Sequence, residues 1–418
     1  MSPRVLADLS PLRRSRDLRL LLGGQSISLV GSQITLVALP YQVFLITGSS
    51  LAVGLISLVE LGPLVILSLL GGAFADAIDR RRMLFVTQVL LALMSAGLAV
   101  NSLLGPRLWP LFAIAALAGG LAGVDSTTRR ALIPALVAPR DLPATAALNA
   151  ILLRSAQVVG PALGGVIIAT IGMSAAYLID LASFAAALVA VSLMRPHPPE
   201  GGGTPVSWAG FCEGIGFLRN TPILQGIMLI DINAMVFGMP RALFPAIGTE
   251  VLGGGGGVVG LLYAAPAAGA FAGAISSGWV SRVRRQGWAV VVAVAGWGAT
   301  IAAVAFVTWL PTVLVLLAVA GFSDIISEVF RATISQVIVP DALRGRLSAL
   351  FIVQVTGAPR VGDLESGAVA AAIGTQLSVL TGGLACIAGL VAIILWRPGI
   401  ATWRVDALGR PVTPPQAG

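Results

Sequence analysis

Long apolar segments follow one another along almost the whole chain, and short polar loops separate them. A helix needs roughly 20 apolar residues to cross the hydrocarbon core of a bilayer. Backbone N–H and C=O groups in lipid must form their hydrogen bonds within their own segment, so such segments are expected to be helices. The pattern predicts twelve membrane-spanning helices, near residues 20–46, 51–74, 83–104, 109–129, 143–171, 174–194, 222–247, 256–279, 288–309, 311–330, 347–373 and 377–396.

A polar segment rich in Pro and Gly follows the sixth predicted helix, over residues 195–205, and its composition is that of a flexible linker. A short surface helix is possible directly after it, over 208–218. We therefore predict an all-α integral membrane protein of two pseudo-symmetric six-helix bundles. Its predicted parts are an N-terminal bundle, a cytoplasmic linker, a C-terminal bundle and a cytoplasmic tail, over residues 1–194, 195–221, 222–396 and 397–418.

The two halves of the sequence repeat one another at two places. Ala52–Leu55 (AVGL) recurs as Val258–Leu261 (VVGL), each at the start of the second helix of its half. Arg130–Ile133 (RALI) recurs as Arg331–Ile334 (RATI), each after the fourth helix. Internal repeats of this length are typical of transporters in which two related bundles share a central cavity.

The basic residues lie on one side of the predicted membrane. The chain is 57% hydrophobic and 11% charged, its formal net charge is +8, and all 26 basic residues are Arg. Of these, 22 fall on the side of both termini, whereas the opposite side clearly has only Arg107. Positive loops face the cytoplasm, so we predict a multi-pass protein of the inner or plasma membrane with both termini cytoplasmic. This topology explains the basic charge without a nucleic-acid partner.

The loop after the second helix, Gly72–Leu84 (GAFADAIDRRRML), resembles the cytoplasmic loop signature of the major facilitator superfamily. Asp79 stands where Gly is commonest in that signature, and the enterobactin-exporter and macrolide-efflux branch often has Asp there. The resemblance implies a cytoplasmic gate, in which acidic residues pair with loop arginines in one conformation and release them in another. The alternative is a loop that only sets topology. The predicted gate residues are Gly72, Asp76, Arg80, Arg81, Asp125, Arg130, Asp324, Glu328 and Arg331.

The fifth predicted helix contains Gly160–Gly165 (GPALGG), which resembles the core of a motif in drug–proton antiporters. Proline removes a backbone hydrogen bond and glycine permits close helix packing, so we predict a hinge formed by Gly160, Pro161, Gly164 and Gly165. The resemblance favours export over import. Gly–Pro kinks are also common in membrane helices that set no direction of transport.

Charged residues inside the predicted helices are costly in lipid and usually functional. The candidate proton-coupling or substrate residues are Glu60, Arg154, Asp180, Asp231, Arg360, Asp363 and Glu365. Of these, the coupling acid is expected to be Glu60, Asp231, Asp363 or Glu365. Arg154 is either a buried functional cation or a structural partner for a carboxylate such as Asp180. Arg360 and Asp363 either line the cavity, where Gly and Pro could unwind their helix, or form a static salt bridge.

These observations predict a secondary active transporter: a proton-driven exporter of an amphiphilic small molecule, such as a drug or siderophore, working by rocker-switch alternating access. The predicted partners are a small-molecule substrate, protons and the lipid bilayer, with a monomer as the working unit. A nutrient uptake permease or facilitator is the alternative, and a non-transporting receptor or scaffold is a weaker one. No metal, cofactor or enzymatic activity is expected, because the sequence has no phosphate-binding loop or metal-ligand cluster and its one histidine, His197, lies in a Pro-rich loop.

Overall fold

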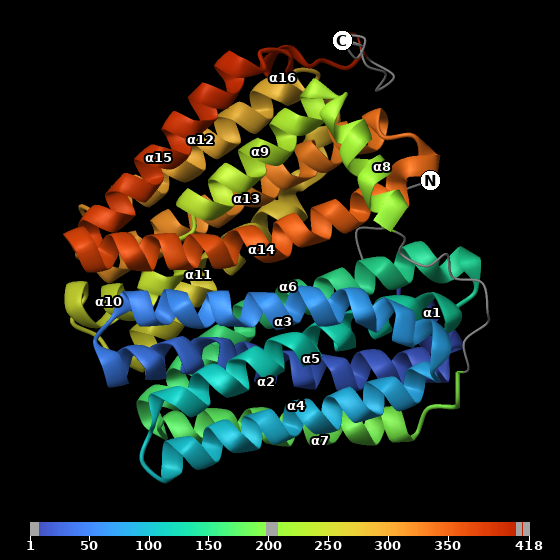
Figure 1. Cartoon of the computed structure of the whole chain (residues 1–418), viewed down its shortest axis with the longest axis vertical. Helices are drawn as coiled ribbons and strands as arrows, with labels where there is room; N and C mark the ends of the chain where they lie inside the picture. The colour runs from blue at the N-terminus through green and yellow to red at the C-terminus, as the bar shows by residue number, and fades with distance from the viewer. Residues whose placement is uncertain (1–7, 198–207, 407–411, 413–418) are drawn as a thin grey trace. The chain divides into compact units, whose positions relative to one another are not determined.

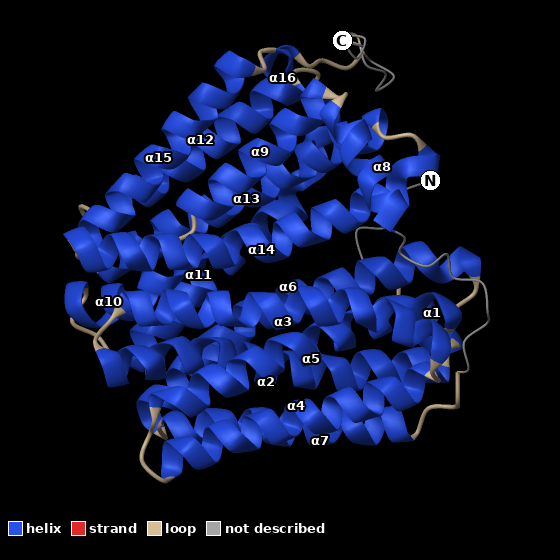
Figure 2. Cartoon of the chain, in the orientation of Figure 1, coloured by secondary structure: helices blue, strands red, loops and turns tan. Residues whose placement is uncertain are grey.

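The computed structural model describes residues 8–197, 208–406 and 412 of the 418-residue chain. Helices account for nearly all of its secondary structure, and short loops join them (Figure 2). Figure 1 labels the helices along the chain. Contacts within the chain define two compact units. The first comprises residues 1–46, 59–206 and 255–264, and the second comprises 47–58, 207–254 and 265–418.

The helices of the first half of the chain are mostly in unit 1. Their bounds are α1 (Ser10–Arg14), α2 (Arg16–Thr47), α3 (Ser50–Ala77), α4 (Arg80–Leu103), α5 (Leu108–Ala135), η1 (Pro139–Asp141), α6 (Leu142–Thr170) and α7 (Met173–Ser192). Asp79 caps α4, because its side chain accepts a hydrogen bond from the backbone N–H of Arg82 at 3.0 Å.

The helices of the second half are mostly in unit 2. They begin with α8 (Trp208–Arg219), α9 (Pro222–Phe237), η2 (Arg241–Leu243), α10 (Phe244–Ala246) and η3 (Ile247–Val251). They continue with α11 (Gly256–Ser276), η4 (Ser277–Arg282), α12 (Gln286–Val304), α13 (Leu310–Ile338), α14 (Asp341–Ile373), α15 (Thr375–Trp396) and α16 (Gly399–Thr402).

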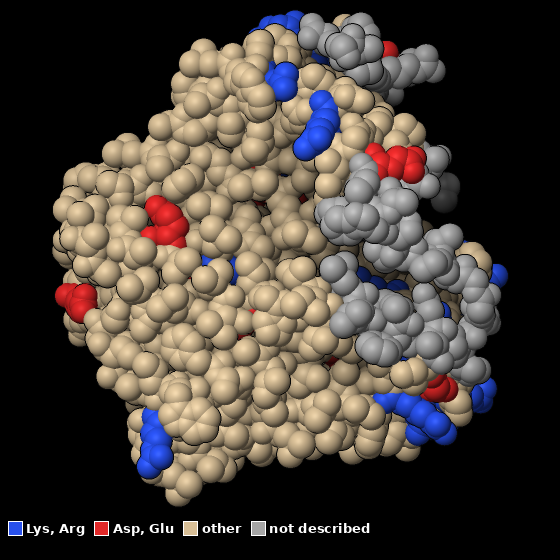
Figure 3. All heavy atoms as spheres, in the orientation of Figure 1, with Lys and Arg blue, Asp and Glu red and all other residues tan. Residues whose placement is uncertain are grey.

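Within the described residues, eleven helices are long and apolar enough to cross a membrane. The twelfth predicted span corresponds to α14, which is long enough at 33 residues but carries several charged side chains. The surface agrees with a lipid environment: the face drawn in Figure 3 is mostly uncharged, and large apolar side chains such as Leu45, Val166, Val292 and Leu395 are exposed. The length of α14 is therefore that of a membrane-spanning helix, and its charged residues distinguish it from the other eleven.

Two stretches differ from the sequence-based expectation. The helix predicted over 222–247 is interrupted after Phe237, and a short 3-10 turn and further short helical turns follow. Gly238 and Pro240 lie at the break, and Pro240 lacks the N–H that a continuous helix needs. By contrast, α14 runs without interruption through Pro359 and its neighbouring glycines, so the local unwinding considered there is absent.

The repeated glycines of the two halves have equivalent surroundings. A Cβ on Gly54 in α3 would meet the backbone carbonyl of Asp363 in α14 within unit 2. A Cβ on Gly260 in α11 would meet the Cα of Gly165 and the carbonyl of Pro161 in α6 within unit 1. In both cases the second helix of one half packs closely against the fifth helix of the other, and the absence of a side chain permits the approach.

The turns after the two fifth helices are also alike. Gly172 follows α6 with φ of 105°, and Gly374 follows α14 with φ of 93°. An L-residue with a side chain rarely adopts this conformation. Each glycine lets the chain reverse within one or two residues into the sixth helix of its half.

Candidate functional site

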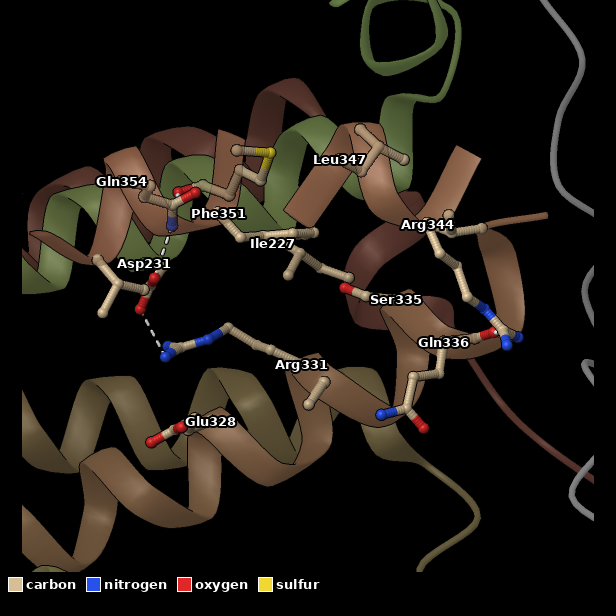
Figure 4. Close-up of a pocket in the computed structure, with 14 residues that line it drawn as sticks. Ile227, Asp231, Glu328, Arg331, Ser335, Gln336, Arg344, Leu347, Phe351 and Gln354 are labelled. Atoms are coloured by element: carbon tan, nitrogen blue, oxygen red, sulfur yellow. Dashed lines mark hydrogen bonds and ion pairs between the residues drawn. The ribbon is translucent and has the colours of Figure 1, made fainter. Parts of the chain in front are cut away.

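A cavity of about 390 Å³ lies within unit 2, between α9, α13 and α14 (Figure 4). Each helix contributes residues at helical spacing, so one face of each helix points to the cavity. The lining residues are Ile227, Met228, Asp231, Glu328, Arg331, Ala332, Ser335, Gln336, Val339, Arg344, Leu347, Phe351, Gln354 and Val355.

A buried ion pair forms one wall of this cavity. The Arg331 Nη2 of α13 lies 2.5 Å from the Asp231 Oδ1 of α9, and the two side chains are only 7% and 9% exposed. The same guanidinium donates a hydrogen bond from Nη1 to the hydroxyl of Ser327 at 2.9 Å. A charge taken out of water this far needs a partner, so each member of the pair depends on the other.

Gln354 connects α14, the third helix of the cavity, with the Asp231–Arg331 pair. Its Nε2 donates a hydrogen bond to the second carboxylate oxygen of Asp231 at 2.6 Å, and it also lies 3.3 Å from the carbonyl oxygen of Met228. Asp231 therefore holds α13 by charge and α14 by a hydrogen bond. A change in the charge of this one carboxylate would alter contacts among all three helices that enclose the cavity.

The two ends of the cavity differ in chemistry. In Figure 4, Asp231, the guanidinium of Arg331 and Glu328 lie at one end, and Gln336 and Arg344 lie at the other. Apolar side chains line the wall between them, including Ile227, Val339, Leu347 and Phe351. Such a cavity suits a ligand with a large apolar body and a few polar groups.

Unit 1 contains a separate buried carboxylate on α7. Asp180 is 2% exposed, and its Oδ2 accepts hydrogen bonds from Thr35 of α2 and Ser95 of α4, both at 2.7 Å. Ser183 donates to its backbone carbonyl, also at 2.7 Å. The described partners of Asp180 are thus hydroxyl groups. Arg154, which the sequence offered as a possible partner, lies on α6 with Nη1 3.5 Å from Gln157.

A third cluster of charges surrounds the middle of α14. Asp363 is buried, and its Oδ2 lies 3.6 Å from Nη2 of Arg241 in η2. Arg360 donates a hydrogen bond to the carbonyl of Thr356 on its own helix at 2.9 Å, whereas Glu365 is half-buried. Asp363 is therefore held from outside its helix by Arg241, a residue that the sequence analysis did not connect with it.

The predicted gate residues of unit 1 have described contacts within that unit. Asp125 of α5 pairs with Arg129 at 2.6 Å and accepts a hydrogen bond from Gln88 at 2.7 Å. Arg80 donates to the carbonyl of Ala131 at 3.3 Å. Arg81 donates to the carbonyls of Val191, at 3.0 Å, and Ser192, at the end of α7.

The remaining predicted residues are placed as follows. Arg130 is exposed, and Asp324 lines a small apolar cavity together with Trp297 and Phe244. Glu60 of α3 is half-buried, and its backbone lies against Gly119 of α5. Gly72 and Asp76 lie in α3, and the description of side chains does not include them. The glycines predicted to form a hinge pack closely: a Cβ on Gly160 or Gly164 would contact α2, and one on Gly165 would contact α11.

Two features of the cavity were missed from the sequence. Arg331 was assigned to the gate, yet its described acidic partner is Asp231, roughly 100 positions earlier in the chain. Gln354 was not singled out, although an amide within an apolar helix is a usable signal.

The helical fold together with the family and the relatives described next defines the class of this protein: it is a transporter of the major facilitator fold. The chain belongs to the transmembrane secretion effector family, which matches it over residues 6–407. Among solved structures, a POT family transporter in complex with 5-aminolevulinic acid covers 92% of this chain and 97% of its own, with a TM-score of 0.73 and 12% identity. A bacterial homologue of the iron transporter ferroportin covers 93% and 99%, with a TM-score of 0.70 and 17% identity.

Curated relatives match along nearly their whole length. The enterobactin exporter EntS of Salmonella choleraesuis is 28% identical over 392 residues, which is 93% of either chain. EntS of Citrobacter koseri is 28% identical over 395 residues, or 93% of this chain and 94% of its own. The relatives are exporters rather than enzymes, and together with the apolar helices they place this chain in the inner membrane as a multi-pass transporter.

Proposed function

We propose that this protein is a proton-driven exporter of an amphiphilic small molecule, such as a drug or a siderophore, and that Asp231 is its coupling acid. Full-length similarity to enterobactin exporters supports the direction and a bulky organic substrate. The observation that carries the proposal is the buried Asp231–Arg331 pair in the wall of an amphiphilic cavity. A buried carboxylate with one cationic partner is a group whose protonation changes the contacts around it.

The proposed cycle begins with Asp231 ionised. In this state its carboxylate holds Arg331 of α13 and Gln354 of α14 against α9. A proton arriving from the acidic outer side neutralises Asp231 and removes the attraction for Arg331. The guanidinium then turns to other acceptors, and the helices around the cavity shift by rocker-switch alternating access. Loss of the proton to the cytoplasm restores the pair and resets the cavity.

The arginine distribution supports an orientation with both termini in the cytoplasm. In that orientation the end of α13 near Gln336, and with it Arg344, faces the cytoplasm, which is where an exporter collects its substrate. The cytoplasmic gate includes the loop between α3 and α4, and the glycines of α6 act as the hinge. The proposed working unit is a monomer.

The test uses purified protein in proteoliposomes with an imposed pH gradient and a panel of labelled amphiphiles. Asp231→Asn removes the titratable group and keeps the side chain's shape, whereas Asp141→Asn is the matched control in a partly exposed ion pair with Arg14. We expect gradient-driven substrate movement in the wild type and in the control, and its loss in Asp231→Asn. Coupled transport that survives in Asp231→Asn would exclude Asp231 as the coupling acid. Accumulation with the proton flow would indicate uptake.

A further inference from the structure

The amide of Gln354 is held in one orientation. Gln354 of α14 is 7% exposed, and its Nε2 donates to Oδ2 of Asp231 at 2.6 Å and to the carbonyl oxygen of Met228 at 3.3 Å (Figure 4). These two contacts use both amide hydrogens. The buried Oε1 has no hydrogen-bond donor among the described residues. Turning the amide over would bring Oε1 against the carbonyl of Met228, which cannot donate, so Nε2 stays on the side of Asp231.

The two carboxylate oxygens of Asp231 have different partners. Oδ1 lies 2.5 Å from Nη2 of Arg331 on α13, and Oδ2 accepts a hydrogen bond from Gln354 on α14. A proton that binds Oδ1 takes the place of the guanidinium and breaks the contact between α9 and α13. A proton that binds Oδ2 leaves Arg331 where it is. The oxygen that takes the proton therefore determines whether protonation moves the helices.

The fixed amide makes the two oxygens unequal sites for a proton. In a protonated carboxyl group the carbonyl oxygen is a stronger hydrogen-bond acceptor than the hydroxyl oxygen. The N–H of Gln354 is therefore satisfied best when Oδ2 is the carbonyl oxygen and the proton is on Oδ1. A hydrogen on Oδ2 would also crowd the amide hydrogen, because the two heavy atoms are only 2.6 Å apart. The proton and the guanidinium thus compete for one atom, Oδ1 of Asp231.

Asp231 has few charged neighbours on the helices that pack against α9. Of the charged residues that the structure describes on α8, α13 and α14, those that line the cavity with Asp231 are Glu328, Arg331 and Arg344. The other three helices, α12, α15 and α16, have no charged residue within their bounds. Glu328 and Arg344 are engaged in interactions of their own, and Arg344 donates to the carbonyl of Gln336 at the opposite end of the cavity. Arg331 is therefore the described charged group whose contact with Asp231 a proton displaces.

We propose that Gln354 is a positioning residue of the proton-coupling site: it directs the proton to Oδ1 of Asp231 and so makes proton binding and the contact with Arg331 mutually exclusive. As the proton binds Oδ1, Arg331 leaves with its positive charge and keeps its hydrogen bond to Ser327, while Oδ2 stays bonded to Gln354. Release of the proton reverses each step. The inference rests on the proposed role of Asp231 as coupling acid and adds the residue that prevents protonation without helix movement.

Infrared spectroscopy of the purified full-length protein in detergent identifies the protonated oxygen. The C=O band of a protonated carboxyl group that appears as the pH is lowered is assigned to Asp231 by its loss in Asp231→Asn. A carbonyl that accepts a hydrogen bond absorbs at lower wavenumber than a free one. We expect the band to move to higher wavenumber in Gln354→Met, because Oδ2 then loses its donor. A band that stays in place would show that the carbonyl oxygen is not the one bonded to Gln354 and would overturn the proposal.

Transport measurements distinguish a coupling role of Gln354 from a structural one. Gln354→Met keeps the length of the side chain and removes the amide. Gradient-driven movement of labelled amphiphiles in proteoliposomes should fall at least about tenfold, because a hydrogen bond to an ionised group is worth roughly one such factor or more. Exchange of the same amphiphile at equal pH on both sides needs no proton and should be retained. Equal loss of both activities would overturn the proposal. Gln376→Met makes the same change at an exposed glutamine of α15 and should alter neither activity.

Failure of this inference can be told apart from failure of the proposed function. If Asp231→Asn abolishes gradient-driven transport but the infrared band does not move in Gln354→Met, Asp231 remains the coupling acid and the role of Gln354 is wrong. If coupled transport survives in Asp231→Asn, or if no carboxyl band is lost in that variant, the coupling acid of the proposed function is wrong and the inference is wrong with it.

Discussion

Removing one member of the Asp231–Arg331 pair should cost far more stability than removing both. Arg331→Met deletes the guanidinium and leaves the carboxylate of Asp231 buried, at 9% exposure of its side chain, with Gln354 as its remaining side-chain partner. Breaking a buried pair in this way costs about 3–5 kcal/mol in soluble proteins, because the remaining charge is desolvated and uncompensated. In the double variant Asp231→Asn, Arg331→Met neither charge remains, and we expect to regain most of that loss.

The assay is a double-mutant cycle on the free energy of unfolding, followed by tryptophan fluorescence as SDS is added to protein in mixed micelles. The ion pair of Arg14 and Asp141 is the internal standard, since the Arg14 side chain is 52% exposed and such a pair contributes about 0–1 kcal/mol. The reasoning is refuted if Arg331→Met costs no more than Asp141→Asn. It is equally refuted if the double variant is as unstable as Arg331→Met alone.

Three further substitutions test the helix packing. Gly260→Val places a branched side chain against the backbone of Gly165, so it should destabilise the protein by about 1–3 kcal/mol and impair transport, as measured by thermal unfolding and proteoliposome assay. Gly62→Ala adds a methyl group where nothing lies within 4 Å, inside α3, and should stabilise by about 0.5–1 kcal/mol; a loss of stability would show that the site is not open. Tyr177→Phe removes the 2.6 Å buried hydrogen bond to Gln42 and should lower the free energy of unfolding by about 1–3 kcal/mol in the same assay. Little change would mean that a water molecule takes the place of the phenol hydroxyl.

Most of the fold could be predicted from the sequence because the length and hydropathy of a segment identify a membrane-spanning helix. The predicted segment over 377–396 and the observed α15, Thr375–Trp396, differ by two residues at one end. The AVGL and VVGL repeats were also informative, and the structure supplies their reason: each glycine lies against a fifth helix. The break after Phe237 was missed, although Gly238 and Pro240 signalled it, because the apolar character of the segment continues across the break.

The candidate site was less predictable, since charges identify residues of interest without identifying their partners. Asp231 was selected for its position in an apolar helix, and the structure places it at a cavity. Its pairing with Arg331 depends on how α9, α13 and α14 meet, which no local pattern encodes. The same holds for Asp363, whose contact with Arg241 follows from the break in the preceding helix that brings η2 beside α14. The bundle boundaries near residues 194, 221 and 396, the hinge and the gate remain predictions.

The unit boundaries have a consequence for dissecting the molecule. Residues 47–58 belong with the second half of the sequence and residues 255–264 with the first, so neither half is a self-sufficient module. A fragment cut at the linker would present Gly165 or the backbone near Asp363 to lipid where a glycine-bearing helix normally covers it. Two such fragments made together in one cell each hold the piece that the other lacks, so we expect the halves to be inactive alone and active when they are produced together.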